Sequence, residues 1–486
     1  MNENAGKLYR TLGYKGPIPE EVTDDLLEAS EVEPDMGERP LLAKEHVAEI
    51  KRRYAENPDE IQQWFIDNWG DDVTEDDIWD ALEDAENALN APEEALESFE
   101  SLFSLRRQTQ LPPNFTFPGM TREIEIDPGS KKFETKGDAI NWVLFAGPQF
   151  IGDKIHLVKK DDFRLHDQFD SNFVYDLTEP PNNGGLDIAL FSDFGTGEYH
   201  SLYIARQLQQ RKFPYAIHLG DVYYAGRRSE FRDYFEGPLD PILSDTKLFT
   251  MNANHELLSG GFPYFDYMKR RRQNHANQEQ EGSYFCLRSQ QFQIVGIDTA
   301  YHEVGRFQEK KLLAWLEKVL SEGRDQGRTN ILLSPDDPYS YGKIGLRDLL
   351  DEDLSSIVLE KKLVDLWFWG NTHYCALFDR TDDLPFLGSC IGHGGYAYTR
   401  KRRFQTSPAP VKFLETMARF PAWTKVRQDR GNNGFCILKL KGNGSIELEY
   451  VDWMSNTRCI AQLAVTDGEK LTVKSVEEMA EPEELM

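Results

Sequence analysis

Four groups of polar side chains that can bind metal ions each follow a short apolar run of the sequence. They are Asp193, Asp221, Asn254 with His255, and His373. Carboxylate, amide and imidazole groups are ligands for hard or borderline metal ions. A single Asp after a strand is commonplace, because Asp also caps helices and turns. Several such groups in chain order, each after an apolar run, indicate a metal site at the ends of buried strands.

The apolar runs that precede these groups predict the strands that position them. Short apolar runs occupy residues 188–192, 215–219, 247–251, 292–297, 331–334 and 366–369, with helical stretches between them. This alternation predicts an α/β sheet whose strand ends hold the site. Beyond Gly431, alternating runs at 435–440, 446–451 and 460–465 predict closing antiparallel strands.

The order of these motifs resembles that of the calcineurin-like metallophosphoesterase superfamily. The chain reads Asp-x-Gly from 193, Gly-Asp-x-x-Tyr from 220, Asn-His-Glu from 254 and Gly-x-x-His from 370. Within the superfamily it is similar to the purple acid phosphatases, where a tyrosine replaces the histidine of the usual Asp-x-His. The resemblance covers roughly residues 186–455. It implies a four-layer α/β/β/α sandwich and metal-dependent hydrolysis of a phosphate ester, by a phosphatase or a phosphodiesterase.

The resemblance also implies a role for each matching residue. The residues that would hold the first metal are Asp193, Asp221, Tyr224 and His373. Asp221 would bridge to a second metal, to which Asn254 would supply an amide oxygen. His255 would protonate the leaving alkoxide, because an imidazole has a pKa near the working pH, and Glu256 would orient that imidazole or lie behind it. The expected cofactors are one or two ions of Fe, Mn, Zn or Mg.

The chain departs from the family pattern at the second metal. The histidine expected after residues 331–334 is replaced by Pro335, Asp336 and Asp337, and the first histidine of the closing Gly-His-x-His motif is Asn371. Three outcomes stay open. Asp336 or Asp337 could join Asn371 in an oxygen-rich site that favours Mg²⁺ or Mn²⁺. The protein could work with one metal. It could instead have lost hydrolysis and bind a phosphorylated ligand or act as a protein-interaction module.

Other polar groups are expected to be structural. They are His200, His218, His302 and His393, which lie near apolar runs or glycine-rich loops. Two basic runs, 269–272 and 400–403, are either solvated loop faces, which we favour, or exposed donors for a polyanionic substrate. The glycine-rich segment 194–197 lacks the lysine of a nucleotide-binding P-loop.

Charge and composition predict four parts. The chain has 486 residues and a net charge of −28, and residues 1–110 hold 29 acidic against 10 basic residues. We expect an acidic helical region at 1–110, a β-rich connecting segment at 111–185, the metallophosphoesterase domain at 186–470 and an acidic tail at 471–486, disordered from Val476 on. This charge disfavours nucleic acid and anionic membranes as partners. The helical region could bind a partner protein, and the substrate would be a phosphorylated small molecule or protein.

Cysteine usage and hydropathy predict the cellular compartment. The five cysteines are scattered and never lie in a Cys-x-x-Cys or Cys/His cluster, which indicates reduced core residues. No apolar stretch approaches 18 residues, and the first 25 residues lack the pattern of a secretion signal. We therefore expect a cytoplasmic protein.

Overall fold

A computed structural model describes most of the chain from residue 163 onward. The described ranges are 163–178, 185–196, 199–223, 226, 230–258, 260–300, 310–341, 345–396, 407–415, 431–466 and 470–479, with positions 48, 51, 52, 55, 56 and 58. Those six N-terminal positions have helical backbone. Several expectations lie outside these ranges: the rest of the helical region 1–110, the connecting segment before 163, Tyr224, His302, the basic run 400–403 and the end of the tail.

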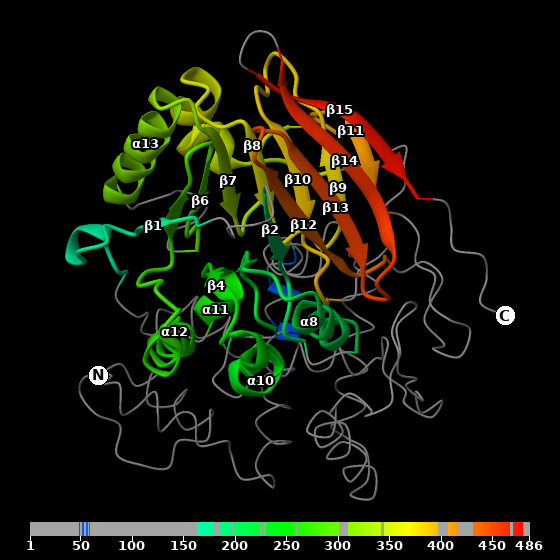
Figure 1. The fold of residues 1–486 in the computed structure, drawn as a ribbon. Helices are drawn as coiled ribbons and strands as arrows, with labels where there is room; N and C mark the ends of the chain where they lie inside the picture. Colours follow the sequence, from blue (N-terminus) through cyan, green and yellow to red (C-terminus); the bar gives the residue numbers. More distant parts are fainter. Residues whose placement is uncertain are drawn as a thin grey trace, which may run out of the picture.

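The strands form two sheets (Figure 1). The first has the order β1-β5-β6-β7-β8-β10-β9-β11, with bounds Val174–Asp176, Phe285–Arg288, Phe292–Gly296, Thr329–Ser334, Leu366–Trp369, Leu387–Ile391, Cys375–Phe378 and Val411–Leu414. The second has the order β15-β14-β13-β12-β2-β3-β4, with bounds Lys470–Glu478, Thr457–Thr466, Ile446–Asp452, Gly434–Lys441, Gly185–Phe191, Tyr215–His218 and Lys247–Thr250.

Parallel strands at the centre of each sheet place the loops of the site. In the second sheet β2 pairs with β3 and β3 with β4, all parallel. In the first sheet β6, β7 and β8 are likewise parallel neighbours. Parallel strands carry their carboxyl ends to one edge of the sheet, so the loops after β2, β3, β4, β7 and β8 gather there.

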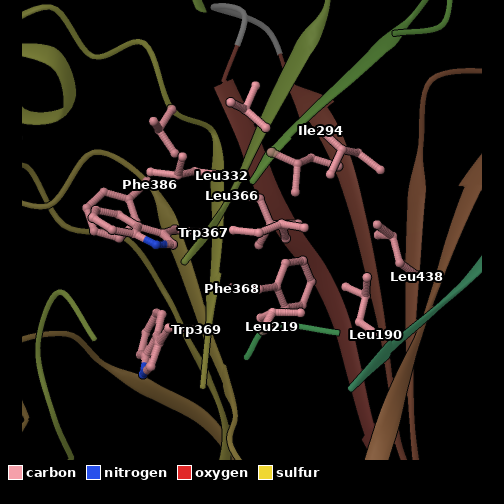
Figure 2. Close-up of a cluster of buried hydrophobic side chains, with 14 of the residues drawn as sticks. Leu190, Leu219, Ile294, Leu332, Leu366, Trp367, Phe368, Trp369, Phe386 and Leu438 are labelled. Atoms are coloured by element: carbon pink, nitrogen blue, oxygen red, sulfur yellow. The ribbon is translucent and has the colours of Figure 1, made fainter. Parts of the chain in front are cut away.

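The strand β8 shows why these segments fold as buried strands. Its four residues are all buried, and successive side chains of a strand point to opposite faces. Leu366 and Phe368 point toward Leu190 and Leu438 of the second sheet, while Trp367 points the other way with Phe386 (Figure 2). A strand covered on both faces needs an unbroken apolar run, which this segment supplies.

Helices cover the outer faces of both sheets. Their bounds are α8 (Tyr199–Arg211), α10 (Gly237–Leu239), α11 (Asn254–Leu258), α12 (Phe262–Asn274) and α13 (Lys310–Asp325), with shorter helical turns at His166–Gln168, Phe231–Glu236, Asp240–Ile242, Leu349–Asp353 and Ser356–Glu360. One core lies between the sheets and under α13, and a second lies between the second sheet and α8, α10 and α12. Figure 1 shows α13 on the opposite side of the molecule from α8, α10 and α12. The four-layer α/β/β/α sandwich is therefore confirmed.

Both sheets extend past the expected domain boundaries. Strand β1 belongs to the segment expected to connect two domains, yet it pairs with β5 and its residue Tyr175 is buried. Strand β15 lies in the segment expected to be an acidic tail, and it pairs with β14 along its whole length. Leu471 is buried, with Val473 and Val476 packed against the same core, which explains why this acidic segment is ordered. The tail is therefore shorter than expected.

None of the helices in the described part of the chain is long and apolar enough to cross a membrane.

Candidate metal centre

Three side chains from separate loops meet at the carboxyl ends of β2, β3 and β8. The hydroxyl of Tyr223 donates to Asp193 Oδ1 at 2.9 Å and lies 2.6 Å from His373 Nε2. His373 Nε2 in turn lies 3.2 Å from Asp193 Oδ1. Donor atoms that share one ion at about 2.1 Å lie roughly 3 Å apart when their bonds meet near a right angle. This triangle of two oxygens and one nitrogen therefore has the size of one face of a metal coordination sphere.

Asp221 provides the strongest indication of a cation-binding site. Its side chain is 1% exposed, and in the described part of the chain no side chain donates a hydrogen bond to its carboxylate oxygens, although the backbone N–H of His255 interacts with the carboxylate. Burial raises the pKa of Asp221 well above its ordinary value, and the nearby carboxyls of Asp193, Glu256 and Asp336 raise it further. Buried carboxylates are normally paired, hydrogen-bonded or bound to metal. The residues present therefore fit a metal ion beside Asp221.

Backbone strain is concentrated on the same loops. Asp193, Asp221, Asn371 and His373 all have positive φ angles, of 55°, 66°, 59° and 38°. Residues other than glycine rarely adopt this conformation, and it persists where the surrounding structure enforces it, commonly at functional sites. The strain turns these side chains toward one another.

Asp193 is held from two directions. Its Oδ1 faces Tyr223 and His373, while its Oδ2 accepts the backbone N–H of Asn371 at 3.0 Å. Burial alone would raise the pKa of Asp193, but hydrogen bonds from His373, Ser192 and Tyr223 lower it. Gly370 allows this approach of the two loops, because a Cβ there would lie 2.0 Å from Ser192 Oγ. Asp193 is therefore an ionised carboxylate held in one orientation, as a metal ligand would need to be.

The helix α11 begins at Asn254 and carries His255 and Glu256 into the site. Glu256 accepts the backbone N–H groups of Asp221, Val222 and Ala253 at 3.3, 3.0 and 3.0 Å. It therefore fastens the loop after β3 to α11. Burial raises the pKa of Glu256 to about 8, although these backbone hydrogen bonds oppose the shift. His255 is fully buried, and its ring centroid lies 4.3 Å from that of Tyr223.

The replacements at the second metal have separate partners. Asn371 Nδ2 donates to Asp336 Oδ1 at 3.0 Å, so these two side chains lie together at the site. Asn371 Oδ1 is buried and has no hydrogen-bond partner within the ranges that the structure describes. Asp337 instead accepts from Ser340 Oγ and pairs with Arg347 Nε at 3.2 Å. Of the two carboxylates, Asp336 is the one beside Asn371.

The donor set is chemically mixed. Among the described residues, no group of three or more His, Cys, Asp or Glu side chains is arranged to hold a metal ion. What converges is a carboxylate, an imidazole and a phenol, with the carboxylate of Asp221 close enough to Asp193 to raise its own pKa. Tyr223 was not anticipated from the sequence. The adjacent tyrosines at 223 and 224 were its signal, but the family spacing pointed to Tyr224.

The remaining histidine candidates form none of the contacts of this triangle that are described above. His218 is buried beside the rings of Phe191 and Phe235, and burial lowers its pKa to about 3. Burial likewise lowers the pKa of His393 to about 4, and His200 contacts the carbonyl oxygen of Gly395. These positions agree with structural roles.

The basic run 269–272 is not a loop: Lys269 is exposed, and its three arginines have partners within the protein. It lies on α12, where Arg270 forms an ion pair with Glu236. Arg271 is buried and donates to Gln280 Oε1 at 3.1 Å, and Arg272 donates to the Gln280 backbone carbonyl at 2.6 Å. The run folds into the protein because α12 packs its inner face on the second sheet and points these side chains at the loop before β5.

Comparison with known proteins identifies the family of one part of the chain. Residues 186–375 match the model of the calcineurin-like phosphoesterase family, and this part of the chain is a calcineurin-like phosphoesterase domain. Members of that family hydrolyse phosphate esters with the help of divalent metal ions. No curated protein sequence matches the chain.

Similar solved structures include two proteins of distant sequence. One is described as GAP50, the anchor in the inner membrane complex of Plasmodium, with a TM-score of 0.42 and 14% identity over 62% of this chain and 91% of that one. The other is a dimetal phosphatase from Danio rerio, with a TM-score of 0.37 and 12% identity over 57% of this chain and 98% of that one.

Proposed function

We propose that this protein hydrolyses a phosphate ester with the help of metal bound by Asp193, Asp221, Asn254 and His373. The observation that carries the proposal is Asp221, whose two buried oxygens receive no side-chain hydrogen bond from the described residues and lie among other carboxyls. Asp193 and His373 are already turned toward a common point by strained backbone. A site built only for folding would gain nothing from an uncompensated carboxylate.

Each residue then has a defined task. Bound metal would supply positive charge for the phosphate oxygens and would make water a better nucleophile near neutral pH. Asp193 and Asp221 provide the negative charge that holds the ions. His255, buried at the start of α11, would hold the proton that the leaving alkoxide takes. Glu256 holds the loop that carries Asp221 against the start of α11.

The test compares a site carboxylate with a surface carboxylate. Hydrolysis of p-nitrophenyl phosphate and of bis(p-nitrophenyl) phosphate is measured with added Mn²⁺, Zn²⁺, Mg²⁺ or Fe. Asp221→Asn should lower kcat/KM by about a hundredfold or more, because it removes the charge that holds metal. Asp187→Asn is the matched control, since Asp187 is exposed on β2. Equal rates in the parent, Asp221→Asn and Asp187→Asn would count against the proposal.

A second candidate function is a catalytically weakened protein that binds a phosphorylated ligand or a protein partner. The hydrogen bond between Asn371 and Asp336 favours this function. The two side chains bind each other, whereas a second metal would need both of them as ligands. Pro335 contributes no ligand. It lies close to the loop of Asp221, since a Cβ on Gly220 would come within 3.4 Å of it.

Restoring the family residues separates the two functions. In the double variant Pro335→His/Asn371→His, two imidazoles stand where the family has them. If the parent is inactive and the double variant gains a second metal and hydrolyses the ester, the parent is a binding protein. If an active parent loses activity in the double variant, the present oxygen ligands form the working site, in which Asp336 and Asn371 favour Mg²⁺ or Mn²⁺.

The wider setting of the protein also belongs to the proposal. We expect a phosphorylated small molecule or protein as substrate, neither nucleic acid nor membrane as partner, and a cytoplasmic location. The net charge of −28 supports the exclusion of polyanions. The acidic region 1–110 is proposed to bind a partner protein, which a pull-down with residues 1–110 deleted from the full chain would test.

A further inference from the structure

The rings of Tyr223 and His373 share a third aromatic neighbour, Tyr396, from the loop after β10. We infer that Tyr396 is a positioning residue of the metal centre, which holds the phenol and the imidazole in place to face Asp193. The inference rests on the proposed metal centre. It adds a residue that no family motif quoted above contains.

Ring geometry makes Tyr396 the shared contact. Its centroid lies 4.5 Å from that of His373 with an interplanar angle of 29°, and 4.6 Å from that of Tyr223 with an angle of 32°. The rings of Tyr223 and His373 lie farther from each other, at 5.9 Å and 59°. Offset, nearly parallel rings at such distances attract each other beyond simple burial. Tyr396 therefore joins two rings that contact each other less closely.

The loop that carries Tyr396 is fastened at both sides. Asn433 Nδ2 donates to the carbonyl oxygens of His393 at 3.0 Å and of Tyr396 at 2.9 Å. On the other side, the Gly394 N–H donates to the Ser192 carbonyl oxygen at 3.0 Å, next to Asp193. Gly394 is required there, since a Cβ would lie 2.0 Å from that oxygen. The ring is thus presented from a fixed backbone that also borders Asp193.

The site needs such a support because its own backbone is strained. His373 has φ of 38° and Asp193 has φ of 55°, so neither loop is in its preferred conformation. Tyr396 is 7% exposed and His373 is 1% exposed, so the stack also shields the imidazole from water. Removing the ring would leave His373 with room to rotate and would admit water between it and Asp193. Groups that orient metal ligands in this way commonly change metal affinity tenfold or more when they are replaced.

The test compares a substitution of Tyr396 that keeps an aromatic ring with one that removes it. Tyr396→Phe keeps the stack, and Tyr396→Leu removes it. The control is Tyr284→Leu, which removes a fully buried ring that packs against Phe173 and Trp315. The first measurement is the NMR signal of the His373 ring in metal-free, histidine-labelled full-length protein, assigned with His373→Gln. The second is the affinity for Mn²⁺ by titration calorimetry.

Tyr396→Leu should shift the His373 ring signal downfield, as the stacked ring current is lost, and weaken Mn²⁺ binding by about tenfold. Tyr396→Phe and Tyr284→Leu should leave both readouts close to those of the parent. An unchanged His373 signal in Tyr396→Leu would overturn the inference, as would equal losses in Tyr396→Leu and Tyr284→Leu. If Tyr396→Leu shifts the His373 signal but the parent binds no Mn²⁺, the proposed metal centre is refuted, while the ring contact between Tyr396 and His373 stands.

Discussion

Tyr223 places its hydroxyl between Asp193 and His373, while Tyr224 lies outside the described residues. A phenolate bound to Fe(III) absorbs visible light, so the colour of the iron-loaded protein reports which phenol is a ligand. We expect Tyr223→Phe to remove this band, because Tyr223 is the phenol that completes the triangle. The measurement is the absorption spectrum of each variant at matched iron content.

Tyr224→Phe is the matched control for this experiment, since it differs from Tyr223→Phe by one position in the same loop. The visible absorption band of the iron-loaded protein should persist in Tyr224→Phe. Loss of the band in Tyr224→Phe, with retention in Tyr223→Phe, would restore the ligand that the family spacing predicts and contradict the geometry described above.

Asp336 and Asp337 are neighbours with different surroundings, and their variants should differ accordingly. Asp337→Asn weakens the pair with Arg347 and should lower the free energy of unfolding by about 1 kcal/mol while leaving metal content unchanged. Asp336→Asn removes the carboxylate beside Asn371 and should lower metal content with little effect on unfolding. Metal analysis and urea unfolding of both variants decide this, and a loss of metal in Asp337→Asn alone would reverse the assignment.

At the scale of elements, apolar runs in the sequence predict the positions of the central strands well. The runs expected at 188–192, 215–219, 247–251, 292–297, 331–334 and 366–369 coincide with β2, β3, β4, β6, β7 and β8. They were predictable because a strand buried on both faces must be apolar throughout. Strands β9, β10 and β11 were not named, since their short runs lie among loops and carry no motif.

The geometry of the loops could not be predicted in the same way. The positive φ angles at Asp193, Asp221 and His373 depend on contacts with distant segments, such as the hydrogen bonds of Glu256 to the loop after β3. No periodic pattern records such contacts. The donors were therefore predictable as residue types, while the choice of Tyr223 and the pairing of Asp336 with Asn371 required the fold.

The strand β15 offers an element-scale test of where the domain ends. Leu471→Ala should lower the free energy of unfolding by about 2–4 kcal/mol, because a buried leucine would leave a cavity. Lys474→Ala on the same strand is exposed and should change it by less than about 0.5 kcal/mol. Urea unfolding measures both. Equal, negligible effects would show that residues 470–478 are not part of the folded core.

At the scale of the whole molecule, buried histidines predict sensitivity to acid. Burial lowers the pKa of His218 to about 3 and that of His393 to about 4, against an ordinary value of 6.5. Below pH 6.5 the unfolded chain therefore takes up protons at these two histidines that the folded chain does not, so their contribution to stability falls as pH decreases toward 4. For His218 this loss is on the order of 3 kcal/mol by pH 4. Buried carboxyls whose pKa is raised, such as Glu256, contribute in the opposite direction over the same range.

His218→Gln should reduce this dependence, because glutamine does not titrate. The measurement is the change in unfolding free energy of metal-free protein between pH 7 and pH 4.5. A slope in His218→Gln as steep as that of the parent would mean that His218 is accessible to protons in the folded state.

The central claim is that the loops after β2, β3 and β8 hold metal. It is tested most directly by the metal content per chain of protein purified without chelator, measured by mass spectrometry for the parent, Asp221→Asn and Asp187→Asn. We predict at least one Fe, Mn, Zn or Mg ion per chain in the parent and in Asp187→Asn, and a loss of at least one ion in Asp221→Asn. A parent free of metal, and not stabilised against heat by added Mn²⁺, Zn²⁺ or Fe, would contradict the claim.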